Sequence, residues 1–298
     1  MFKTILLTVL ALLAFAGNSV LCRLALNDNI IDAASFTSIR LFSGAIFLLL
    51  LISINVHKSP QKIINIKAGS WLSALFLFIY AGAFSYAYIS LDTGTGALIL
   101  FGSVQVTMIL SDIFKGKKLL LAEWLGLIIA FIGLIILLMP SASAPSLTGF
   151  LLMAISGIAW GFYTLAGRGS KTPLVDTTNN FLRTLPFIGL LMLLTLSNIE
   201  LSNQGILLAI ISGTMTSGLG YAIWYSALSG LTVKHAAIIQ LSVPVIAAIG
   251  GVIFSNETIN IELITSSFLV LGGVLTVIMG KQSMERLQRA YKRSIKRF

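Results

Sequence analysis

Two arginines lie inside stretches of sequence that are otherwise almost entirely apolar. Arg40 and Arg183 each lie about seven residues into such a stretch, which corresponds to roughly 10 Å along a helix axis. A guanidinium can hold a carboxylate or a phosphate through two parallel hydrogen bonds. It can also remain buried by pairing with carbonyls at a helix end, or by extending to a polar boundary. The similar placement of the two arginines favours the second role, structural or gating.

Three amides and many aromatic rings share these apolar stretches. A cavity with aromatic walls and a few hydrogen-bonding groups would suit a small amphiphilic metabolite. We therefore predict that a substrate is bound by Asn18, Tyr80, Tyr86, Phe101, Gln105, Trp160, Tyr163, Tyr221, Trp224 and Gln240. The alternative is that the amides hold neighbouring helices together and that the Tyr and Trp rings lie at the membrane surface.

Other kinds of chemistry have little support in the sequence. The chain has one cysteine, Cys22, which excludes an internal disulfide and a zinc site built from cysteines. His57 and His235 each lie beside a lysine in a polar break, where a histidine is usually solvated. The Asp92-Thr93-Gly94 triplet of aspartic proteases occurs once, between apolar stretches. We expect neither an enzyme nor a resident metal or other cofactor.

The acidic residues avoid the centres of the apolar stretches. Asp112 and Glu123 lie near the ends of two stretches, and Asp92 lies near the end of another. A proton relay through carboxylates is therefore not expected.

The composition indicates that membrane helices hold these residues. The chain has 298 residues, of which 57% are hydrophobic and 10% are charged. Soluble proteins have about 25% charged residues. We therefore predict an all-α integral membrane protein.

Polar breaks divide the chain into ten apolar segments, each about 20–25 residues long, the length that a helix needs to cross a bilayer. These segments are 4–26, 33–54, 68–91, 95–114, 119–139, 147–167, 175–196, 204–228, 231–255 and 258–280.

Lysine and arginine are concentrated in every second break, whereas Asp and Glu are concentrated in the others. Because cytoplasmic loops are enriched in Lys and Arg, both termini are predicted to be cytoplasmic, in a bacterial-type cytoplasmic (inner) membrane. Removal of the first segment as a signal peptide would leave nine segments and break the alternation. The net charge of +10 therefore indicates topology, and no nucleic-acid partner is expected.

The two halves of the chain resemble each other in sequence. Ile113-Phe114 matches Ile253-Phe254 in order, Arg40 matches Arg183, and Tyr86 matches Tyr221. The two units are 4–139 and 147–280, and each has five predicted helices. An odd number of helices places the second unit upside down relative to the first. Inverted repeats around a central cavity are typical of secondary transporters, which bind substrate at the repeat interface.

Prolines and small residues have predicted roles in the helices. Pro186 and Pro244 are expected to kink their helices, and Pro244 to take part in gating. Small residues in the fifth and tenth segments would allow close packing or dimerisation, so a monomer or a homodimer is expected. They are Gly126, Ala130, Gly133, Ser266, Gly272 and Gly273.

The last residues, 281–298, are basic and amphipathic. Apolar residues, from Met284 to Phe298, recur at helical spacing, and basic residues lie between them. We predict a cytoplasmic helix that lies in the plane of the membrane on anionic headgroups.

These features together resemble the drug/metabolite transporter (DMT) superfamily, and specifically its ten-helix proteins with two EamA-type halves. The runs Leu91–Ala97 and Phe101–Met108 are similar to one EamA subgroup, and Pro244 followed by Phe254 and Glu257 is similar to the usual end of the ninth helix. Val104 stands where the first half would have its matching proline. The resemblance implies helices around a central cavity, with the fifth and tenth helices at the periphery.

The sequence therefore predicts a secondary transporter that exports a small amphiphilic metabolite by alternating access. The resemblance implies substrates such as amino acids, purines or drugs. The alternative in the same superfamily is a flippase for a lipid or a lipid-linked headgroup. An intramembrane enzyme or a channel is less favoured.

Overall fold

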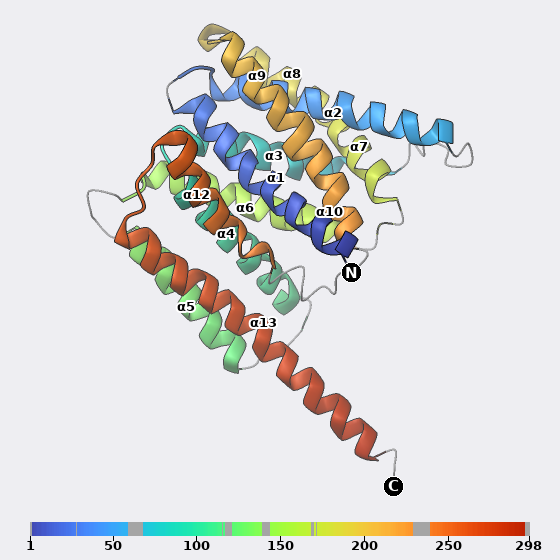
Figure 1. Ribbon diagram of the computed structural model, residues 1–298, viewed down its shortest axis with the longest axis vertical. Helices are drawn as coiled ribbons and strands as arrows, with labels where there is room; N and C mark the ends of the chain where they lie inside the picture. Colours follow the sequence, from blue (N-terminus) through green and yellow to red (C-terminus); the bar gives the residue numbers. More distant parts are fainter. Residues whose placement is uncertain are drawn as a thin grey trace.

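The protein is an all-helical bundle (Figure 1). The computed structural model describes residues 2–27, 29–58, 68–114, 116, 121–138, 144–167, 170, 172–228 and 239–295, and these contain no β-strand. In the first half of the chain the helices are α1 (Phe2–Leu26), α2 (Ala33–Lys58), α3 (Trp71–Tyr88), α4 (Thr93–Phe114) and α5 (Leu121–Leu137).

The second half has shorter helices and more breaks. It contains α6 (Leu147–Gly167), α7 (Pro173–Arg183), α8 (Leu185–Leu194), the short 3-10 helix η1 (Leu196–Asn198), α9 (Asn203–Ile211), the π-helix η2 (Ser212–Leu219), α10 (Gly220–Leu228), α12 (Val243–Ser255) and α13 (Ile261–Ile295).

The predicted fold class is confirmed. Each of the ten predicted apolar segments is helical over most of its described length, and residues 231–238 of the ninth lie outside the described residues. Within the described residues, six helical spans are long and apolar enough to cross a membrane, one of them running through α9, η2 and α10, and three apolar helices are shorter. The seventh segment is divided into α7 and α8, and the eighth into α9, η2 and α10. The inverted relation between the halves stays a prediction.

Polar residues in the breaks start several helices. The hydroxyl of Ser70 accepts a hydrogen bond from the backbone N–H of Ser73 at the start of α3, and Ser202 accepts one from Gly205 at the start of α9. The carboxylate of Asp32 accepts a hydrogen bond from Ser35 at the start of α2. Such caps satisfy N–H groups that the first helical turn leaves without partners.

Each of the two prolines that are predicted to kink a helix lies instead at the start of one. Pro186 lies in the first turn of α8, directly after the break that ends α7, and Pro244 lies in the first turn of α12. A proline is tolerated there because the first turn needs no intrahelical N–H donor. Val104, at the matching place in the first half, lies in the unbroken α4.

Helices from the two halves interlock at the centre of the bundle. Helix α1 packs against α9, η2, α10 and α12, all from the second half, and α2 packs against α7, α8, α9 and η2. Helix α6 packs against α3 and α4 of the first half. The central core is therefore built jointly by both halves.

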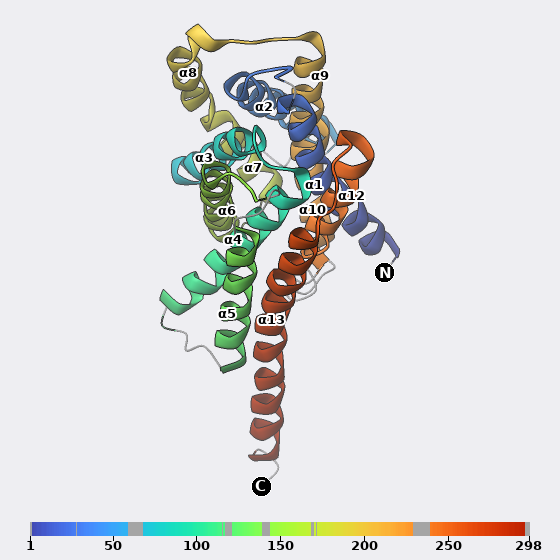
Figure 2. The ribbon, with the colours of Figure 1, turned by 90° about the vertical axis from the view of Figure 1, so that its left-hand side faces the viewer.

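Helices α5 and α13 form a peripheral pair, as the resemblance implied. They run side by side in both views (Figures 1 and 2) and pack mainly on each other. A Cβ atom added at Gly273 would lie 2.5 Å from the carbonyl oxygen of Gly126, and a Cβ at Gly126 would clash with the carbonyl of Gly273. The predicted small residues therefore bring two helices of the same chain together.

This close approach predicts opposite effects for two glycine substitutions. We expect Gly126→Ala to destabilise the protein by about 1–3 kcal/mol, because the new methyl group meets backbone of α13. Gly272→Ala is the matched control, since a Cβ there meets no atom within 4 Å, and alanine favours a helix over glycine. Melting temperatures of the purified variants in detergent measure both effects. Equal melting temperatures would contradict the packing.

The tail is helical as far as Ile295, and its placement in the plane of the membrane stays a prediction. Helix α13 continues without interruption from Ile261 to Ile295, and the part after residue 280 extends along the axis of the membrane segment (Figure 1).

Candidate functional site

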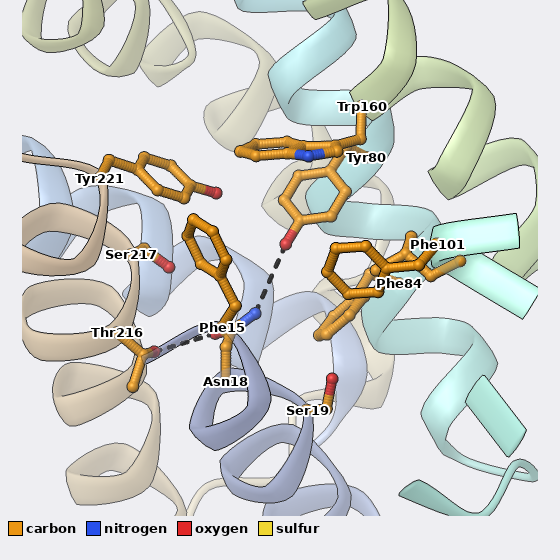
Figure 3. Close-up of a pocket in the computed structure, with 11 residues that line it drawn as sticks. Phe15, Asn18, Ser19, Tyr80, Phe84, Phe101, Trp160, Thr216, Ser217 and Tyr221 are labelled. Carbon is orange, nitrogen blue, oxygen red and sulfur yellow. Dashed lines mark hydrogen bonds between the residues drawn. The ribbon is translucent and has the colours of Figure 1, made fainter. Parts of the chain in front are cut away.

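A small cavity lies at the centre of the bundle. Its volume is about 20 Å³, room for about one water molecule. Helices α1, α3, α4 and α6 contribute to it together with η2 and α10. The lining residues are Phe15, Asn18, Ser19, Tyr80, Phe84, Leu100, Phe101, Trp160, Thr216, Ser217 and Tyr221 (Figure 3). Both halves of the chain thus supply its walls.

Asn18 is the centre of a hydrogen-bond network in one wall. Its side-chain oxygen accepts hydrogen bonds from the hydroxyls of Ser212 at 2.7 Å and Thr216 at 3.1 Å. Its amide nitrogen donates to the hydroxyl of Tyr80 at 3.4 Å. Figure 3 shows Asn18 reaching from α1 between Thr216 and Tyr80. The amide thereby joins α1 and α3 of the first half to η2 of the second.

The π-helix η2 presents these hydroxyls. A π-helical turn widens the backbone and often occurs at functional sites. Here the widened segment Ser212–Leu219 lies against α2, where a Cβ at Gly213 would clash with the carbonyl of Arg40. Glycine at this position therefore allows η2 to approach α2 and brings Ser217 within reach of the Arg40 side chain.

Aromatic rings form the other walls. The ring of Trp160 lies 4.7 Å from that of Tyr80, 5.1 Å from Tyr221 and 5.4 Å from Tyr163, measured between centroids. The centroid of the Phe15 ring lies 6.1 Å from that of Tyr221. Such offset and tilted pairs fix the rings in place, and they give the cavity flat apolar walls.

Arg40 lies directly behind this wall. It is 1% exposed. Its Nη2 donates to the hydroxyl of Tyr80 at 3.0 Å and its Nε to the hydroxyl of Ser217 at 3.2 Å. The guanidinium also lies over the rings of Tyr80 and Phe84, 5.3 and 5.1 Å from their centroids. Arg40 therefore contacts three residues that line the cavity.

A charged cluster closes one end of the bundle above the cavity. Arg23 donates to Asp92 at 3.2 Å and to Glu257 at 3.1 Å, and Glu257 also accepts hydrogen bonds from the backbone N–H and the hydroxyl of Thr93. We call Arg23, Asp92, Thr93 and Glu257 the Arg23 cluster. It joins the end of α1 and the start of α4 to the break after α12.

The local fold after α12 places Glu257 in this cluster. Asn256 has the left-handed conformation, with φ of 51°, and the N–H of Glu257 donates to the carbonyl of Gly251. This turn reverses the chain at the helix end. The carboxylate then meets the N-terminus of α4, where a negative charge is favourable.

The predicted acidic breaks meet at this same end. Besides the Arg23 cluster, hydrogen bonds between Asp32 and Glu200 connect the break before α2 to the break before α9. A hydrogen bond between Ser90 and Ser146 connects the break after α3 to the break before α6. The breaks in which Asp and Glu are concentrated therefore lie together at one end of the bundle. We call this end the acidic end.

A second polar seam joins the halves at the opposite end. Gly69, with φ of 73°, donates its N–H to Asp176, and Ser70 donates to Asn180, both at 2.9 Å. Arg183 donates to the carbonyl of Ala68 at 2.7 Å. We call these contacts of Ala68–Ser70 with α7 the α7 seam. Arg183 is a half-buried residue of this seam, whereas Arg40 is fully buried beside the cavity, so the two arginines have different environments.

The structure brings together five of the ten predicted binding residues at the cavity: Asn18, Tyr80, Phe101, Trp160 and Tyr221. Two more support its walls, since Tyr163 stacks on Trp160 and Trp224 packs against Phe15 at 5.7 Å. Their role in binding a substrate stays a prediction.

The other three residues lie elsewhere. Tyr86 lines a separate pocket of about 250 Å³ at the acidic end, with Asp32 and Glu200. Gln105 is buried on α4 and Gln240 is partly exposed before α12, and neither is among the lining residues of the cavity. Pro244 is buried in the first turn of α12.

Sequence reasoning missed several lining residues. Phe15 and Ser19 flank Asn18 at helical spacing, and Phe84 follows Tyr80 by one turn, so the 3.6-residue period contained a signal for them. The hydroxyls of η2 had no comparable signal, because the sequence does not reveal that a π-helix forms there. The Arg23 cluster was missed because its members lie far apart along the chain.

Comparison with known proteins connects this architecture to one family. The model of the EamA-like transporter family matches residues 2–139 and 147–279. A solved crystal structure of a protein superposes with a TM-score of 0.62 at 16% sequence identity, covering 92% of this chain and 96% of that one. The latter match supports the fold alone.

Related sequences cover most of the chain. An uncharacterized protein of Pseudomonas aeruginosa is 50% identical over 276 residues, which cover 93% of this chain and 94% of the relative. The uncharacterized transporter YoaV of Bacillus subtilis is 22% identical, covering 80% and 85%. An uncharacterized transporter of Archaeoglobus fulgidus is 27% identical, covering 63% and 68%.

Proposed function

Because the chain belongs to the EamA-like transporter family, we propose that it is a secondary transporter that exports a small amphiphilic metabolite through the central cavity. The observation that carries this proposal is the cavity itself, whose aromatic walls and Asn18 network come from both halves of the chain. Family membership indicates a multi-pass membrane transporter rather than an enzyme.

The mechanism that the geometry supports is alternating access. The Arg23 cluster joins the halves at the acidic end, and the α7 seam joins them at the other. Opening toward one side requires the contacts at that end to separate while the other end stays closed. With the basic breaks in the cytoplasm, the Arg23 cluster forms the outer gate and the α7 seam the inner gate.

The small volume of the cavity corresponds to a contracted state. About 20 Å³ is too little for a metabolite of several atoms, since one water molecule already needs about 10–15 Å³. Binding therefore requires Trp160, Tyr80 and Tyr221 to move apart as one gate opens. No Asp or Glu is among the lining residues, so transport is facilitated diffusion, or is coupled through the substrate or Arg40.

The test is a resistance and efflux screen on cells that overproduce the protein. We expect a toxic metabolite or drug for which overproduction increases resistance and speeds efflux. Asn18→Ala should abolish both effects at an unchanged protein level, because it removes the network that joins α1, α3 and η2. An efflux rate that Asn18→Ala leaves unchanged would contradict the assignment of the cavity.

A lateral groove supports a second candidate, a lipid or lipid-linked headgroup flippase. An apolar groove of about 350 Å³ lies between α1 and α12, and Ala16 and Gly17 in it are neighbours in sequence of Phe15 and Asn18 in the cavity. A flippase would move a fluorescent lipid analogue between leaflets in a headgroup-dependent way. A metabolite exporter would leave the analogue in its leaflet while transporting the metabolite.

A further inference from the structure

The strongest unexplained feature of the core is the charge of Arg40. A buried arginine is normally paired with a carboxylate, because an isolated charge in an apolar medium is strongly unfavourable. The ion pairs of Arg23 with Asp92 and Glu257 do not include Arg40, and no described carboxylate lies within ion-pair distance of it. The described part of the chain therefore provides no counter-ion for Arg40.

The guanidinium also has an unused donor. Nε and Nη2 donate to Ser217 and Tyr80, but Nη1 is buried and has no hydrogen-bond partner among the described residues. The rings of Tyr80 and Phe84 attract the positive charge through their faces. A ring face does not replace the oxygen acceptor that a buried N–H requires, so this packing explains the position of Arg40 and leaves Nη1 unsatisfied.

The position of Arg40 connects this donor to the cavity. The two residues that hold its guanidinium, Tyr80 and Ser217, both line the cavity. The cavity must widen to admit a substrate, and a displacement of either side chain would uncover the guanidinium. A substrate oxygen could then receive hydrogen bonds from the same group that now donates to Tyr80 and Ser217.

We propose that the cavity binds a monoanionic carboxylate on an apolar, planar body, with the carboxylate on the Arg40 guanidinium and the body between the aromatic rings. This assignment rests on the proposed function. One cation matches one carboxylate in charge, and the planar fork of arginine matches the carboxylate in shape. The rings of Trp160, Tyr80 and Tyr221 provide the flat walls for the body.

Two other classes of substrate, phosphate monoesters and zwitterionic amino acids, fit the cavity less well. A phosphate monoester carries nearly two negative charges at neutral pH, whereas Arg40 is the one cation among the described residues that contacts the lining of the cavity. A zwitterionic amino acid also needs an acceptor for its ammonium group. The side-chain oxygen of Asn18 already accepts two hydrogen bonds, and no carboxylate is among the lining residues.

The test compares an acid with its isosteric amide on the purified full-length protein. Phenylacetate and phenylacetamide have the same shape and differ in charge, and equilibrium dialysis with radiolabelled phenylacetate measures their binding by competition. We expect the wild type to bind phenylacetate at least about tenfold more tightly than the amide, because the acid gains charge-assisted hydrogen bonds. Phenyl phosphate and phenylalanine, as further competitors, should both be weaker than phenylacetate.

Variants of two arginines test whether the preference for the acid over the amide depends on Arg40. Arg40→Gln should abolish the preference for the acid, whereas Arg286→Gln, the matched control in the part of α13 after residue 280, should preserve it. If Arg40→Gln does not fold, Arg40→Lys replaces it, and a smaller but measurable preference is expected because the charge remains without the planar fork. A structural arginine alone would lower the melting temperature of these variants without any acid–amide difference in the wild type.

Several outcomes would overturn the assignment. These are equal binding of acid and amide by the wild type, no binding of either, tighter binding of phenyl phosphate or phenylalanine, or an acid preference that survives in Arg40→Gln. If one of these outcomes is found and the protein still transports an uncharged metabolite in a saturable way, only the assignment of a carboxylate substrate is refuted. The proposed transport function then stands. Absence of transport for every metabolite would instead refute the proposed function.

Discussion

Trp160→Ala is expected to reduce the transport rate by about tenfold or more. The indole ring contacts Tyr80, Tyr163 and Tyr221 at once, and each such aromatic pair contributes about 0.5–1.5 kcal/mol beyond its buried area. Removal of the ring leaves the cavity without its central wall and allows its neighbours to rearrange. The measurement is the initial rate of efflux of a metabolite identified in the screen, normalised to the amount of protein in the membrane.

The matched control is a tryptophan at the periphery. Trp124 on α5 is 49% exposed on the bundle surface, so Trp124→Ala should leave the rate within about twofold of the wild type, as is usual for surface positions. Trp160→Phe keeps a ring in the cavity and should retain part of the activity. Equal rates for Trp160→Ala and Trp124→Ala would show that the substrate does not pass the Trp160 ring.

Arg23→Gln is expected to open the acidic end and to expose Cys22. Arg23 and Glu257 form the buried pair of this cluster. Removal of one partner from a buried ion pair costs about 3–5 kcal/mol, and every 1.4 kcal/mol changes a population tenfold. Cys22 is the single cysteine of the chain and is buried. It lies on the same face of α1 as Phe15, Asn18 and Ser19, between the cavity and the Arg23 cluster.

Alkylation of intact cells with a membrane-impermeant maleimide measures this exposure. We expect Cys22 to be protected in the wild type and to react about tenfold faster or more in Arg23→Gln and in Glu257→Gln. Glu262→Gln is the matched control, because Glu262 forms no ion pair with the described residues. Protection of Cys22 in both cluster variants, in protein that still elutes as a folded species, would exclude the Arg23 cluster as the outer gate.

Much of the architecture follows from hydrophobicity and charge alone. Apolar length predicted the helices, and the concentration of Asp and Glu in every second break predicted that these breaks share one end, as the contacts of Arg23 with Asp92 and of Asp32 with Glu200 show. These properties depend on transfer from water to lipid, which acts on each segment separately.

The face of each helix that points inward was harder to predict. Tyr80 and Tyr86 lie six residues apart on α3, a rotation of about 240° around the helix, and only Tyr80 lines the cavity. In a helix that is apolar all round, hydrophobicity does not distinguish the lipid face from the core face. The contacts of polar partners decide it: Tyr80 meets Asn18 and Arg40.

The two arginines show the same limit. Their similar positions along the chain suggested a common role, but Arg183 contacts the backbone of Ala68, whereas Arg40 lies among Tyr80, Phe84 and Ser217. The difference arises from neighbours on other helices. The π-helix that supplies Ser217 has no recognisable sequence pattern, so the surroundings of Arg40 required the structure.

Counterflow in proteoliposomes tests the central claim most directly. Purified protein is reconstituted with an unlabelled metabolite from the screen inside the vesicles, and uptake of the labelled metabolite is followed. An alternating-access transporter with one central site predicts uptake that saturates with concentration, is accelerated by the internal unlabelled metabolite, and is lost in Asn18→Ala. Uptake that rises linearly with concentration and does not respond to the internal metabolite would contradict the account and indicate a channel.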